Sequence, residues 1–176
     1  MSRNRVYIQK LCLASLFLAL DILLARFLSL ELAQGNRIGL QFIAYGLEGW
    51  LLGPYWAMGA AVAGDILGMV INSGGYLFNP LFLLIAALKG YLFGLFLYKK
   101  KPGLLRAFAT VLLGLVCVDM TLGSYALSQL LGISWGDHFA MKLPFRAATY
   151  PIYALLLYDL QEALARTKVL KHYENQ

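Results

Sequence analysis

The chain has 176 residues, of which 60% are apolar and only 14% are charged. A soluble domain of this length needs a more polar surface, so the composition excludes an ordinary soluble protein and predicts an integral membrane protein. About six transmembrane helices of roughly 20 residues would use nearly the whole length. We therefore expect a single all-α membrane domain over residues 1–176, with no soluble catalytic or nucleotide-binding domain.

Six apolar runs are predicted to be the transmembrane helices. They lie at about residues 8–30, 38–52, 55–71, 80–98, 104–131 and 143–165. Gly53-Pro54, Pro80 and Pro102-Gly103 stand between runs, where glycine ends a helix and proline suits the first turn of the next one. The polar segment 132–142 is expected to be a loop.

Basic residues gather at the N-terminus, after the fourth run and in the C-terminal tail. With six spans these three places fall on one side of the membrane, and because cytoplasmic loops are rich in Lys and Arg, both termini are expected to be cytoplasmic. The loops 31–37, 72–79 and 132–142 then lie outside. This multi-pass plan accounts for the net charge of +6 without nucleic acid as a partner.

Several ionisable residues fall inside the predicted spans, where each is expected to be paired or to line a cavity. Asp21 and Lys89 both lie near the middle of the bilayer by helical rise, which favours an ion pair between the first and fourth spans. Arg26 could line a cavity or reach the lipid headgroups. Glu48, near the inner end of the second span, is expected to serve the cytoplasmic interface.

Asp65 and Asp119 lie slightly outward of the middle of their spans. A carboxylate there could accept two hydrogen bonds from the planar edge of a pterin or purine. The alternative is a structural partner such as Lys89 or Arg146.

Cations are concentrated at the expected outer ends of the helices. Lys142 and Arg146 are four residues apart at the start of the sixth span, and Arg26 and Arg37 lie at the same depth or beyond. Such a group of cations would suit a substrate with carboxylates. Contact with headgroup phosphates is the alternative.

The outer loop 72–79 has the composition of a binding loop. Asn79 offers a hydrogen-bond donor and acceptor, and Tyr76 and Phe78 offer flat faces for an aromatic ring. Asn72, seven residues after Asp65, continues the helical face of that carboxylate toward the loop. A tight turn with interfacial aromatic residues is the alternative reading.

Small residues recur four positions apart, which lets helices approach closely within the protein or against another subunit. The candidate partner-interface residues are Ser15, Ala19, Ala57, Ala60, Ala61 and Gly64. Periodicity alone does not separate the two kinds of contact.

The signatures of common enzymes are missing from the sequence. It has no phosphate-binding loop of the GxxxxGKS/T type and no zinc-ligand spacing, and no histidine lies at the depth of Ser124 to act as a base. We therefore expect no enzyme activity, no catalytic residue, no metal site and no cofactor.

Three stretches of the chain resemble the substrate-binding (S) components of energy-coupling factor (ECF) vitamin transporters, and specifically the folate family. They are LCLASLFLALDILLARFLSL, IGLQFIAYGLEGWLLGPYWAMGAAVAGDILG and GGYLFNPLFLLIAALKGYLFGLFLYKK. The resemblance covers most of residues 8–101 and implies a six-helix protein that binds a vitamin on its outer side. It implies a transmembrane coupling subunit, contacted near Ser15 and Ala19, and two ATP-binding subunits that energise an ABC-type importer. It also implies that the loops after spans one and three act as lids.

Folate would suit the chemistry of the candidate residues. A pterin edge matches a carboxylate, an aromatic ring matches the loop aromatics, and the glutamate carboxylates match Arg26, Arg37, Lys142 or Arg146. Two alternatives stay open: an S component for another vitamin or a nucleobase-like substrate, and a non-transporting membrane scaffold whose embedded charges are purely structural.

Overall fold

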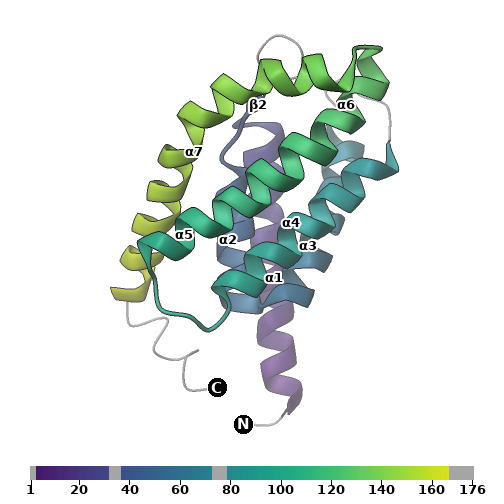
Figure 1. The fold of residues 1–176 in the computed structure, drawn as a ribbon. Coiled ribbons are helices and arrows are strands. Elements are labelled where there is room, and N and C mark those ends of the chain that lie inside the picture. The colour runs from purple at the N-terminus through teal and green to yellow at the C-terminus, as the bar shows by residue number, and fades with distance from the viewer. Residues whose placement is uncertain (1–2, 32–36, 73–78, 167–176) are drawn as a thin grey trace.

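The computed structural model describes residues 3–31, 37–72 and 79–166, which form a bundle of helices (Figure 1). The helices are α1 (Arg3–Arg26), α2 (Gln41–Leu52), α3 (Pro54–Ile71), α4 (Pro80–Leu97), α5 (Leu104–Val111), the π-helix η2 (Leu112–Gly123), α6 (Ser124–Leu131) and α7 (Trp135–Arg166). Two short antiparallel strands, β1 (Leu30–Glu31) and β2 (Arg37–Ile38), lie between α1 and α2, with Leu30 opposite Ile38. In Figure 1, α1 begins and α7 ends at one end of the molecule, and β2 lies toward the other.

Within the described ranges, four helical stretches are long and apolar enough to cross a membrane. They are Tyr7–Arg26, Pro54–Ile71, Pro80–Leu97 and Leu104–Leu131, the last made of α5, η2 and α6 in succession. The prediction of a helical membrane protein is confirmed by these stretches. α2 has only 12 residues, most of them buried inside the bundle.

Two predicted boundaries were wrong. The first helix ends at Arg26 and not near residue 30, because the chain then enters β1. Most of the expected loop 132–142 is helical, since α7 begins at Trp135 after Gly132 ends α6 in the left-handed conformation. Pro144 and Pro151 lie inside α7, which changes direction along its length in Figure 1.

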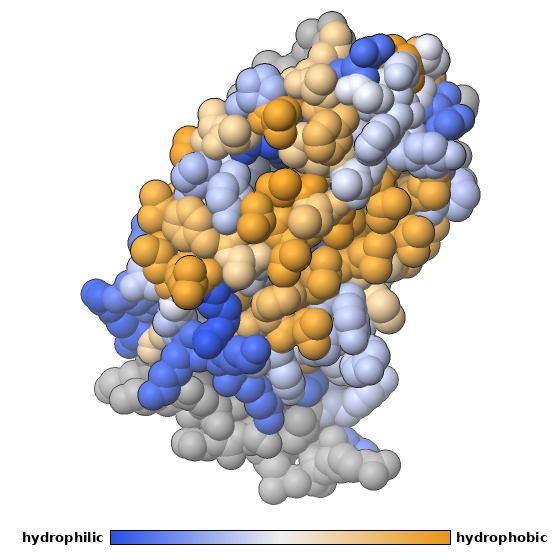
Figure 2. Space-filling view, in the orientation of Figure 1, coloured by the Kyte–Doolittle hydropathy of each residue, from blue (hydrophilic) through white to orange (hydrophobic). Residues whose placement is uncertain are grey.

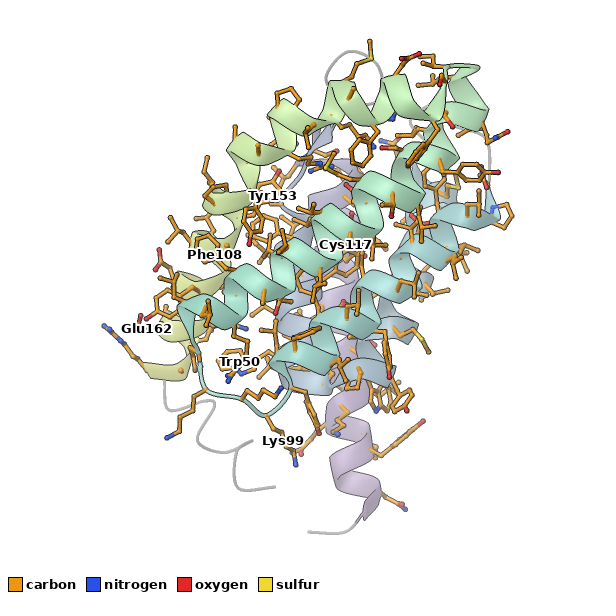
Figure 3. All side chains as sticks on the ribbon, viewed as in Figure 1. Trp50, Lys99, Phe108, Cys117, Tyr153 and Glu162 are labelled. Carbon is orange, nitrogen blue, oxygen red and sulfur yellow. The ribbon has the colours of Figure 1, made fainter. Side chains whose placement is uncertain are left out.

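The surface of the bundle is apolar where a lipid-facing surface is expected. Leu105, Val70 and Leu16 are among its most exposed large hydrophobic side chains. Figure 2 shows hydrophobic residues over the middle of one face and strongly hydrophilic ones near the end where α7 finishes. At that same end Lys99 lies below Trp50, whose indole N–H donates to the carbonyl of Lys100 over 2.9 Å (Figure 3).

α3 and α4 are in direct backbone contact. A methyl group added to Gly90 would lie 2.5 Å from the carbonyl oxygen of Ala57, and one added to Gly94 would lie 2.5 Å from the nitrogen of Pro54. Glycine is needed at both positions because any larger side chain would meet backbone atoms of α3. This contact fixes two walls of the bundle relative to each other.

Ion pairs join helices that are far apart in the sequence. Asp119 of η2 accepts from Lys89 of α4 over 2.8 Å and from Arg146 of α7 over 2.5 Å. The predicted pair of Asp21 with Lys89 is therefore wrong. Asp21 is 1% exposed, and neither of its carboxyl oxygens has a hydrogen-bond partner among the described residues.

Gly94→Ala is expected to lower stability by about 1–3 kcal/mol, the usual range for overpacking a closely packed site. The added methyl group would overlap backbone atoms, which cannot rotate away. Thermal unfolding of the purified protein in detergent would measure the change. Gly59→Ala is the matched control, because nothing lies within 4 Å of its added methyl group; equal midpoints for the two variants would contradict the close contact.

Lys89→Met is expected to destabilise the protein by about 1.5–3 kcal/mol, because Asp119 loses one of its two charged donors. Asp21→Asn should leave stability unchanged or raise it, since burying an unpaired charge is unfavourable. Thermal unfolding of both variants tests this contrast. If the two substitutions lowered stability equally, Asp21 and Lys89 would be acting as a pair after all.

Candidate functional site

A cavity of about 170 Å³ lies inside the bundle, lined by residues of α1, α2, α3, α4, η2, α6 and α7. Its charged lining residues are Arg26, Asp65, Lys89, Asp119, Lys142 and Arg146. Small-molecule sites usually measure roughly 300–1,000 Å³. The described residues therefore enclose room for one part of a vitamin-sized ligand.

Half of the predicted substrate-binding residues meet in this cavity. Arg26, Asp65, Asp119, Lys142 and Arg146 come from four different elements and all line it. Sequence reasoning placed them between the middle of the membrane and its outer edge, and the packing of the helices brings them together.

The remaining predicted substrate residues are not part of the described cavity lining. Asn72 is exposed at the end of α3, and the side chain of Asn79 accepts the N–H of Leu81 and so caps α4. Arg37 is described only by its backbone in β2. Tyr76 and Phe78 lie outside the described residues.

Arg26 and Asp65 form the second ion pair of the cavity, with 3.4 Å between the guanidinium Nη2 and the carboxylate Oδ1. A methyl group added to Gly68 would lie 2.9 Å from Arg26 Nε, so the absence of a side chain at Gly68 lets the arginine lie against α3. Arg26 therefore faces inward and lines the cavity. Of the two positions expected for it, this is the cavity and not the lipid headgroups.

Lys142 differs from the other cations of the cavity. Its side chain is buried, with 3% of the residue exposed, and no carboxylate of the described residues forms an ion pair with it. Arg146, one turn further along α7, bonds to Asp119 through Nη2, while its Nε is buried without a hydrogen-bond partner. On this side of the cavity, Arg146 Nε thus lacks a hydrogen-bond acceptor and Lys142 lacks an ion-pair partner among the described residues.

Two polar residues of the cavity were not predicted. Gln41 and Tyr45 of α2 line it, and the amide of Gln41 donates to the hydroxyl of Tyr45 over 2.9 Å. Their spacing of four places both on one face of the helix. The sequence could have identified them as cavity residues, because they place two polar groups on one face of an otherwise apolar helix.

The candidate interface residues divide into two groups. Ala57 and Ala61 are fully buried, both beside Gly90 of α4, and Gly64 lies against the carboxyl group of Asp21. These three residues therefore pack within the chain. Glu48 is also 0% exposed, so its side chain is packed inside the bundle and is not part of an exposed surface.

Ser15 and Ala60 lie in a groove between α1 and α3 that has a volume of about 360 Å³. Its lining residues are Leu11, Ala14, Ser15, Leu18, Tyr55, Trp56, Gly59, Ala60 and Ala63. Ala19 is exposed on α1 outside this lining. The groove is mainly apolar, because the hydroxyl of Ser15 donates to the carbonyl of Leu11 in its own helix.

Comparison with known proteins agrees with this architecture. A family model described as "ECF-type riboflavin transporter, S component" matches residues 5–156. The folate transporter FolT of Clostridium novyi (strain NT) is 31% identical over 153 residues, which cover 87% of this chain and 88% of that protein. A crystal structure of FolT bound with folic acid matches with a TM-score of 0.79 and 28% identity, over 87% of this chain and 92% of the other. The chain therefore belongs to the family of S components of ECF-type transporters.

Proposed function

We propose that this chain is the vitamin-binding subunit of an ECF importer and that its vitamin is folate. The observation that carries the proposal is the charge of the cavity, in which four cations face two carboxylates among the lining residues. A surplus of two positive charges in a largely buried site favours an anionic ligand. Folate, with its glutamate carboxylates, is such a ligand.

Riboflavin is the second candidate, because the matching family model carries its name. Riboflavin is uncharged at neutral pH, so it would leave the surplus cations of the cavity without a counter-charge. The likeness to the curated FolT sequence and to the structure of FolT bound with folic acid also supports folate over riboflavin.

The roles of individual residues follow from their charge and place. Lys142 and Arg146 would bind ligand carboxylates, with Arg37 beyond them, and Arg26 would line the cavity beside Asp65, with which it is paired. Asp65, which is half-buried at the cavity, would accept hydrogen bonds from the pterin edge.

The loop residues remain predictions. Tyr76 and Phe78 would stack on the ligand, and the flanking Asn72 and Asn79 would border it. Asn79 also has a structural role, since it caps α4.

We infer a six-span topology with both termini in the cytoplasm of a bacterial cell. It is supported by the position of the basic residues: Lys99, Lys100, Lys101 and Arg106 follow α4 near the end where α1 begins and α7 finishes. The cavity residue Arg26 ends α1, and Lys142 lies near the start of α7, so both are toward the opposite end. The cavity would then receive its ligand from outside.

The energy for transport would come from partner subunits. The family implies a transmembrane coupling subunit and two ATP-binding subunits, and the sequence has no phosphate-binding loop of its own. The groove that contains Ser15 and Ala60 is the surface we propose for the coupling subunit, with Ala19 at its edge on α1.

Folate at micromolar concentration is expected to raise the thermal unfolding midpoint of the purified protein, whereas riboflavin, biotin and pantothenate should not.

Arg146→Ala and Asp65→Asn should weaken folate binding about tenfold or more, the effect of losing a charged hydrogen bond. Isothermal titration measures the affinities. Arg166→Ala is the control, because Arg166 pairs with Glu162 on the exposed outer side of α7 (Figure 3); a response to riboflavin alone would reject folate.

Gly59→Leu is expected to fill the groove and to reduce copurification of the coupling subunit, while the response to ligand is kept. Space for the leucine exists, since nothing lies within 4 Å of a methyl group built on Gly59. Quantitative mass spectrometry after affinity purification measures the partners. Val70→Leu, at a residue of the same helix that is 80% exposed, is the control; unchanged copurification would exclude this groove as the docking surface.

A further inference from the structure

The side of the cavity next to η2 holds three cations around one carboxylate. Lys89, Lys142 and Arg146 all line the cavity beside Asp119. A methyl group built on Gly123 would lie 3.3 Å from Asp119 Oδ1 and 3.9 Å from Lys142 Nζ, so both groups flank this glycine. The cluster therefore carries more positive charge than its own carboxylate offsets.

Both oxygens of Asp119 are already engaged. Oδ1 accepts from Lys89 and Oδ2 accepts from Arg146. Lys142 therefore stays without an ion-pair partner in the described parts of the chain, although it is 97% buried, being only 3% exposed. A buried lysine that forms no ion pair of its own is unfavourable for the folded protein.

A second unfilled donor lies on the same helix. Arg146 Nε is buried and makes no hydrogen bond within the described residues, while Nη2 of the same guanidinium is held by Asp119. Lys142 and Arg146 are four residues apart, so their side chains leave α7 on the same face. One more carboxylate would satisfy Lys142 Nζ and Arg146 Nε together.

We propose that Lys142 and Arg146 form the anchor for one carboxylate of the ligand, and that Asp119 is a positioning residue that holds Arg146 ready for it. The inference rests on the proposed function to the extent that the ligand is an anion. Lys142 then lowers the stability of the ligand-free protein and is needed to bind the ligand. Lys89, by contrast, has a structural role, because it is already paired.

The test compares Lys142→Met with Lys89→Met, two equal changes at lysines of the same cavity. Lys142→Met should raise the thermal unfolding midpoint of the ligand-free protein, because it removes an unpaired buried charge, whereas Lys89→Met should lower it. If Lys142 had only a structural role, as Lys89 has, both variants would lower the midpoint. A lower midpoint for Lys142→Met, or failure of that variant to fold, would overturn the proposal.

Ligand binding provides the second measurement. Lys142→Met should weaken the binding of folate about tenfold or more and leave the binding of a neutral pterin, without the aminobenzoyl-glutamate part, within about twofold of wild type. Equal losses for both ligands would overturn the anchor. If wild-type protein gave no response to folate, the folate assignment would fail, and the midpoint of Lys142→Met would still decide whether the lysine is unpaired.

Discussion

The contact of Asp119 with two cations is the interaction on which the interior of this protein depends. Charged groups are costly inside a membrane unless they are paired. The carboxylate on η2 pairs with Lys89 from α4 and Arg146 from α7, and so joins three helices around a polar space. The same contact leaves other donors of the cavity available, which is what a site for an anionic vitamin needs.

The sequence predicted the apolar helices better than it predicted which charged residues form pairs. Hydropathy and helical rise give the depth of a residue in the bilayer, and by depth alone Asp21 and Asp119 were both suitable partners for Lys89. Which of them faces Lys89 depends on how the helices are rotated and packed, and the pattern of one chain does not contain that information. Asp21 instead lies against Gly64.

Local composition was misleading for one segment and only partly informative for the small residues of α3. The segment 132–142 contains glycine and charged residues and precedes Pro144, which are loop signals, but an interfacial helix has the same composition and α7 continues through both prolines. The small-residue stripes of α3 predicted close helix approach correctly. Part of that approach is internal, because Ala57 and Ala61 pack against Gly90, whereas the groove beside Ser15 is open.

The backbone contact between α3 and α4 has a mechanical consequence. Gly90 and Gly94 allow the two helices to touch without side chains between them, so sliding or separating them would break many contacts at once. We therefore expect α3 and α4 to keep their relative position as one rigid unit. Any rearrangement that lets a nutrient enter or leave is then expected to take place around this pair rather than within it.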